Sequence, residues 1–102
     1  MAIAGTIVTN SNTTVFTATG NQAIVSIILC NYSDTTAETI TAYAGSATDA
    51  NMIINDLSIA AKETVALSQD VIGKLILENG NTIIVKGSTG SLVSCVVSSI
   101  AL

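Results

Sequence analysis

Few residues in this chain of 102 are able to do chemistry, and their types argue against most enzyme mechanisms. The chain has no His, so acid–base catalysis would fall to carboxylates, Lys or Tyr. Its Ser, Thr and Cys side chains have no imidazole or Gly-x-Ser-x-Gly elbow to activate them. The run Gly87-Ser88-Thr89-Gly90 is not a phosphate loop, because no Gly-Lys-Ser/Thr follows it. We therefore expect no enzyme and assign no catalytic or cofactor-binding residue.

The carboxylates form only one local oxygen-rich group. Asp49 and Asp56 enclose Asn51 and Asn55, and hard cations such as Ca²⁺ bind oxygen ligands of this kind. The group lacks the alternate-residue spacing of a calcium loop, and three apolar residues interrupt it. No pair of carboxylates is marked out to face each other across a cleft, as a glycosidase requires. We interpret the group as turn chemistry and predict no metal site.

Two cysteines, Cys30 and Cys95, are too far apart in sequence for a Cys-x-x-Cys redox or zinc motif. They would be able to face each other in a β-sandwich, but a disulfide needs an oxidising compartment. The N-terminal MAIAGTIVTN has no basic region or long apolar stretch, so we expect no signal peptide. We therefore predict two buried free thiols that act as small apolar fillers.

Charge and hydropathy narrow the possible partners. The net charge is −4 with three Lys and no Arg, which is too little positive charge to bind nucleic acid. The longest apolar run, 23–30, falls far short of the roughly 20 residues that cross a bilayer, so we expect no membrane partner. Charged residues make up only 10%, against roughly 25% in an average soluble domain. Such a surface suits either a Thr-coated β domain or one that is partly covered by partners.

Short strand patterns with turn signals every 8 to 12 residues run along the whole chain, and these elements position the side chains discussed above. The expected strands lie at 5–9, 14–18, 23–31, 38–44, 57–60, 63–67, 75–77, 82–85 and 92–100. A loop with one helical turn near Asp49 is expected at 45–56, and a crossover at 68–73. Together the patterns predict an all-β fold: an antiparallel two-sheet β-sandwich of immunoglobulin-like or jelly-roll type with seven or eight strands. Residues 13–102 form its single domain, and residues 1–12 form an N-terminal strand or an arm that reaches a neighbour.

Three segments allow more detailed predictions. Both faces of 23–31 are apolar, which predicts a central strand covered on both sides. Asn79-Gly80 is a strong hairpin signal that predicts pairing of 75–77 with 82–85. In 92–100, Val93, Cys95 and Val97 share one face, while the other face mixes Ser with Val and Ile. The mixed face suits a contact surface as well as a core.

The residues also resemble a known family. The runs 14-TVFTATGNQAIVSIILCNYSDTTAETITAYAGS-46, 57-LSIAAKETVALS-68 and 75-LILENGNTIIVKGSTGSLVSCVVSSIAL-102 are similar to small virion structural proteins of tailed bacteriophages. That family shows TVYT, A-I-V…I-x-x-x-N, I-x-A-x-x-T and L-E-x-G-D-T-I motifs. The similarity extends from Thr14 to the end of the chain, and Asn81 stands where the family often has Asp.

The resemblance implies a capsid decoration (cement) protein, made in the host cytoplasm and located on the capsid surface of the virion. Such a protein is often a homotrimer that stabilises the shell by binding across junctions of the major capsid protein. A small tail, neck or fibre-associated virion protein is the first alternative. A carbohydrate-binding β-sandwich module, with Tyr32 and Tyr43 as its aromatic platforms, is the second.

Overall fold

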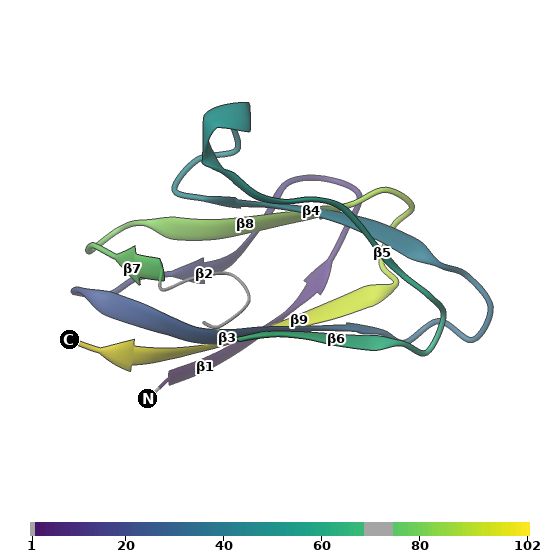
Figure 1. Ribbon diagram of the computed structural model, residues 1–102, viewed down its shortest axis with the longest axis horizontal. Coiled ribbons are helices and arrows are strands. Elements are labelled where there is room, and N and C mark those ends of the chain that lie inside the picture. The colour runs from purple at the N-terminus through teal and green to yellow at the C-terminus, as the bar shows by residue number, and fades with distance from the viewer. Residues whose placement is uncertain (1, 69–74) are drawn as a thin grey trace.

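The computed structural model describes residues 2–68 and 75–102, and these residues form an all-β protein with one short 3₁₀ helix (Figure 1). The strands run in chain order and are bounded as follows: β1 (Ala2–Val8), β2 (Thr13–Thr17), β3 (Gln22–Asn31), β4 (Glu38–Ala44), β5 (Met52–Ile59), β6 (Thr64–Ser68), β7 (Leu75–Leu77), β8 (Thr82–Gly87) and β9 (Val93–Ala101). The helix η1 (Asp49–Asn51) precedes β5. The described residues thus form nine strands, as many as the strand patterns in the sequence, although a sandwich of seven or eight was expected.

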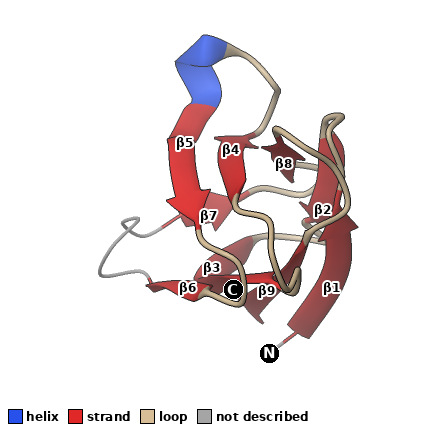
Figure 2. Ribbon diagram, turned by 90° about the vertical axis from the view of Figure 1, so that its right-hand side faces the viewer, coloured by secondary structure: helices blue, strands red, loops and turns tan. Residues whose placement is uncertain are grey.

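The strands build two antiparallel sheets packed face to face, which confirms the predicted sandwich (Figure 2). One sheet has the order β1-β9-β3-β6, with β7 paired to the other end of β3; the second has the order β2-β8-β4-β5. Apart from the extra strand β7, the pairing is nested: β1 with β9, β2 with β8, β3 with β6 and β4 with β5. Nested pairing of this kind is the jelly-roll topology, so it decides between the two sandwich types.

The core fills the space between the two sheets. Its largest fully buried apolar side chains are Ile, Leu and Val from both layers: Val8, Ile24, Ile27, Leu29, Ile40, Ile59, Ile83, Val85, Val93 and Val97. Asn31 ties the layers together at one end, since its Nδ2 donates to Thr36 O at 2.9 Å and to Ile59 O at 3.1 Å. Every buried side-chain nitrogen and oxygen in the described ranges has a hydrogen-bond partner, as expected of a well-formed interior.

The N-terminal residues belong to the sandwich. β1 pairs with β9 in continuous register from Ala2↔Ser99 to Val8↔Val93, and Val8 is fully buried. The sequence left a strand or an arm as possibilities for this stretch, and residues 2–8 form the strand.

The predicted hairpin between 75–77 and 82–85 is wrong. β7 pairs with β3 in one sheet, whereas β8 lies in the other sheet. The Asn79-Gly80 turn is instead tied to the β2–β3 connection, because Gly20 N donates to Asn79 Oδ1 at 2.9 Å and Gly80 N donates to Ala18 O at 2.9 Å. Gly80 does adopt the positive φ that the motif predicts, at 89°, but the turn carries the chain between layers.

Two other predictions need correction. The expected 45–56 loop ends early: η1 lies at Asp49–Asn51 as predicted, but β5 already begins at Met52. β3 is central in its sheet, yet only one of its faces packs against the core; the other lies on the outside of the sandwich. A bulge between Ile24 and Ser26 shifts the alternation, so that Ile24, Ile27 and Leu29 point inward. The expected crossover at 68–73 lies almost wholly outside the described residues.

Candidate functional site

The outer face of the five-stranded sheet is the first candidate surface. Strand register places its outward residues in transverse rows: Ile3–Ser98–Ser26–Ser68, Gly5–Val96–Ile28–Ala66, Ile7–Ser94–Cys30–Thr64 and Ile100–Ala23–Ile76. The five strands of this sheet contain no Asp, Glu, Lys or Arg. We call these outward residues the charge-free face.

Large apolar side chains stand out on the charge-free face. Ile3 is 72% exposed, Ile76 57%, and both Ile7 and Ile100 46%. The remaining positions carry no charge and mix hydroxyl side chains with small or apolar ones: Ser26, Ser68, Ser94, Ser98 and Thr64, together with Gly5, Ala23, Ala66, Ile28, Val96 and Cys30. The mixed face of β9 that the sequence predicts is therefore found on the outside, while Val93, Cys95 and Val97 are fully buried in the core.

The two cysteines lie on neighbouring strands but on opposite faces of the sheet. Cys30 pairs with Ser94 and points outward, half-buried on the charge-free face, whereas Cys95 pairs with Leu29 and is fully buried. Both are free thiols, as predicted, although only Cys95 is a core filler. Burial raises the pKa of the Cys95 thiol to about 12, so Cys95 is inert at neutral pH.

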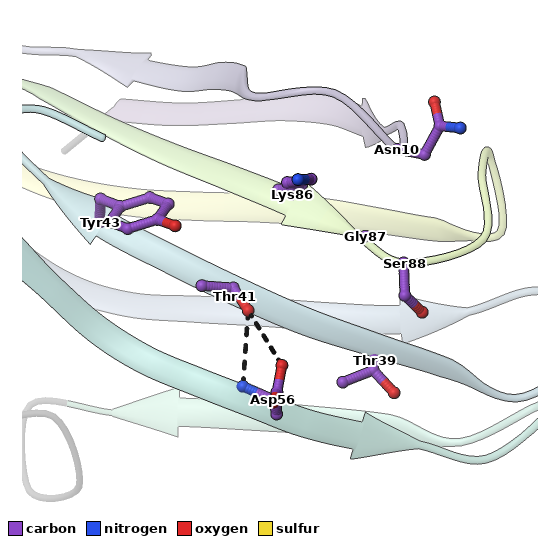
Figure 3. A pocket seen from close by; sticks show the side chains of 8 residues that line it. All are labelled: Asn10, Thr39, Thr41, Tyr43, Asp56, Lys86, Gly87 and Ser88. Atoms are coloured by element: carbon purple, nitrogen blue, oxygen red, sulfur yellow. Dashed lines mark hydrogen bonds between the residues drawn. The ribbon is translucent and has the colours of Figure 1, made fainter. Parts of the chain in front are cut away.

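The second candidate surface is a polar groove on the outer face of the other sheet (Figure 3). It has a volume of about 350 Å³ and is formed by β4, β5 and β8 together with the β1–β2 loop. Its lining residues are Asn10, Thr39, Thr41, Tyr43, Asp56, Lys86, Gly87 and Ser88. Tyr43 lies at one end, Asn10 and Ser88 lie at the other, and Thr41, Asp56 and Lys86 lie between them (Figure 3).

Strand geometry explains the arrangement in the middle of the groove. Thr41 on β4 pairs with Lys86 on β8, and a bulge in β5 places Asp56 on its other side. With strands about 4.8 Å apart, the Lys86 and Asp56 backbones are separated by about 10 Å across Thr41. A cationic and an anionic side chain thus flank a floor of threonine hydroxyls.

Asp56 occupies the groove through an unusual backbone conformation. Its φ is 52°, in the left-handed region that Asp adopts more readily than most residues other than Gly. Thr41 holds the bulge, because its Oγ1 donates to Asp56 Oδ1 at 3.4 Å and accepts from Asp56 N at 3.5 Å. Bulges of this kind reorient side chains and are frequent beside functional sites.

A buried carboxylate fixes the Ser88 end of the groove. Glu38, only 1% exposed, accepts hydrogen bonds from five donor groups: Thr39 N at 2.9 Å, Ser88 N at 2.9 Å, Ser88 Oγ at 2.6 Å, Thr89 N at 3.0 Å and Gly90 N at 3.1 Å. Gly87 is required here, since a Cβ at this position would lie 2.8 Å from Glu38 Oε2.

The ionised form of Glu38 is favoured in the folded chain. Burial acts to raise the pKa of Glu38, but the hydrogen bonds from Ser88, Gly90, Thr39 and Thr89 outweigh it and lower the pKa below 4.5. Residues 88–90 thus form an anion-binding turn whose anion is a side chain of the same protein. No local sequence pattern predicts this contact, because Glu38 and Ser88 are 50 residues apart.

The structure separates the residues that the sequence grouped together. Tyr43 lines the groove, whereas Tyr32 lies outside it and donates from its hydroxyl to Ser91 O at 2.6 Å. Asp49 begins η1 and Asp56 lines the groove, while Asn51 donates to Ala44 O at 2.7 Å as a turn residue. Within residues 2–68 and 75–102, no group of three or more His, Cys, Asp or Glu is placed to hold a metal ion.

The described part of the chain contains no helix of the length and apolarity needed to span a membrane. Comparison with protein-family models, with curated proteins and with solved structures finds no match to this chain.

Proposed function

We propose that this protein is a virion structural protein, specifically a capsid decoration protein that stabilises the shell by binding across junctions of the major capsid protein. The charge-free face is the observation that carries the proposal. It presents four exposed isoleucines on a sheet whose strands have no charged residue. Exposed apolar surface of this kind marks interaction sites, and edge strands without charge or proline are suited to being covered.

The size of the charge-free face favours an assembly with many copies. Four strands about 4.8 Å apart and seven residues of about 3.3 Å rise give a flat area of about 400 Å². At about 25 cal/mol per Å², complete burial of such an area contributes at most about 10 kcal/mol, which is similar to the cost of association. A single contact is therefore weak, and repetition around a homotrimer and over a shell supplies the missing affinity through avidity.

The fold agrees with the proposal by analogy only. Jelly rolls are common in viral capsid proteins and in lectins, and a fold by itself does not assign a function. The analogy therefore supports the decoration reading and the carbohydrate-binding alternative alike.

The test uses one substitution at two matched positions. Ile28 and Ile84 are both half-buried isoleucines on outer sheet faces, Ile28 in the charge-free face and Ile84 in the opposite sheet. In sedimentation we expect a trimer for the wild type. Added to shells of the virus that encodes it, the wild type and Ile84→Glu should raise the temperature of shell disruption, and Ile28→Glu should not.

Cys30 provides a second readout of the same contact. We expect alkylation of Cys30 to slow when the protein is bound to shells, while the buried Cys95 stays unreactive in both states. A wild-type chain that remains monomeric and leaves the shells unchanged would contradict the decoration proposal. Binding to tails alone would instead assign the protein to the tail, neck or fibre.

A further inference from the structure

We infer that the groove around Tyr43 is a binding site for a saccharide. The inference concerns the sheet opposite the charge-free face, so it goes beyond the proposed function and does not depend on it. It assigns a location and a set of lining residues to the carbohydrate-binding alternative, which the sequence left open.

The chemistry of the lining selects a polyhydroxylated ligand. Tyr43 provides the only aromatic ring in the groove, and a ring can stack against the apolar face of a sugar. The Asp56 carboxylate accepts hydrogen bonds from hydroxyls, the Lys86 ammonium donates them, and the hydroxyls of Thr39 and Thr41 do both. Pockets for small molecules combine an aromatic contact with a few placed polar groups, and about 350 Å³ lies at the lower end of their usual size.

Lys86 gives the groove a preference that can be tested. It is the only cationic residue among those that line the groove, and it lies across Thr41 from Asp56. An ammonium group in this position pairs with a carboxylate, so a uronic acid should be bound more tightly than the matching neutral sugar.

The groove is held in shape before any ligand binds. Thr41, Tyr43 and Lys86 project from paired strands in the sheet. The bulge at Asp56 is held by Thr41, and the Ser88 end is held by the buried Glu38. A preformed site loses less entropy on binding than a loop that must become ordered.

The two sheets lie against each other as two layers (Figure 2), and the groove and the charge-free face lie on their outer sides. A protein whose charge-free face is covered by a shell would thus present the groove to solvent. Variants in the groove and variants in the charge-free face test different claims, so one can fail while the other stands.

The experiment is a glycan array of neutral and uronic-acid oligosaccharides, probed with the full chain carrying a C-terminal biotin on streptavidin. We expect the wild type to bind and Tyr43→Ala to lose about tenfold or more in affinity, because the ring contact is removed. Tyr32→Ala is the matched control: this tyrosine is 51% exposed and lies outside the groove, so its loss should leave binding unchanged.

Two conservative variants test the polar contacts with little risk to folding. Asn tolerates the left-handed backbone at residue 56, so Asp56→Asn should keep the fold and weaken binding of neutral saccharides, whose hydroxyls lose a charged acceptor. Lys86→Gln should weaken the uronic acids selectively. Absence of binding by the folded wild type would overturn the inference. So would equal binding by the wild type and Tyr43→Ala, or loss of binding in Tyr32→Ala alone.

Discussion

The buried carboxylate of Glu38 stabilises the β8–β9 turn only while it is ionised. Its oxygens face the donors Thr39 N, Ser88 N and Oγ, Thr89 N and Gly90 N, and protonation would turn one acceptor oxygen into a donor. Because its folded pKa is lower than the unfolded value of 4.5, Glu38 adds stability above that value. This contribution is lost as the pH falls through 4.5 and below.

Glu38→Gln tests this account. Gln keeps the shape but presents an NH₂ group to N–H donors, so we expect the free energy of unfolding at pH 7 to fall by about 1.5–3 kcal/mol. The difference from the wild type should narrow as the pH is lowered below 4.5, as measured by chemical denaturation. Glu78 is exposed, so Glu78→Gln should change stability by less than about 0.5 kcal/mol. A gap that does not depend on pH would contradict the account.

At the scale of single residues, alternation along a strand is what the sequence predicts well. It put Val93, Cys95 and Val97 together on one face of β9, and that face is the buried one. It could not separate Tyr43 from Tyr32 or find the contact between Glu38 and Ser88. Those features depend on which distant strands become neighbours, and no local pattern encodes that.

At the scale of elements, the strands were predictable and their partners were not. The Asn79-Gly80 signal correctly predicted a turn, but β7 has only three residues and pairs with β3 in the other sheet. Hairpin rules assume that consecutive strands pair, whereas among the described strands of this jelly roll β4 and β5 alone do so, and the other pairs join strands further apart in the chain. The early start of β5 was missed for a related reason, because two bulges interrupt its pairing with β4 and disturb the alternation.

The turn between β5 and β6 offers a prediction at this scale. Lys62 has a φ of 65°, where a residue with a Cβ is strained by about 1–2 kcal/mol. Glycine relieves this strain and costs about 0.5–1 kcal/mol in unfolded-state entropy, so Lys62→Gly should stabilise the protein by about 0.5–1 kcal/mol.

Thermal or chemical unfolding measures the effect, and the neighbouring residue is the control. Ala61 does not have a positive φ, so Ala61→Gly should lower stability by about 0.5–1 kcal/mol. If both glycine variants were destabilised alike, the turn would not be strained at Lys62.

At the scale of the whole molecule, the distribution of charge is uneven. The described charged residues lie in turns, in loops, in η1 or on the four-stranded sheet, and the five-stranded sheet has none in its strands. A net charge of −4 makes identical chains repel one another. Copies or partners therefore meet the least electrostatic repulsion when they approach the uncharged face. Composition left open whether the surface is a Thr-coated one or is partly covered by partners, and strand register shows which face of the sandwich is free of charge.

An electron cryo-microscopy map of the virus particle tests the central claim most directly. The account predicts that the protein is on the shell, with the outer face of β1, β9, β3 and β6 against the major capsid protein or another copy. The groove around Tyr43 should then face solvent. A map in which the protein is absent from the particle, or is bound with its charge-free face open to solvent, would contradict the account.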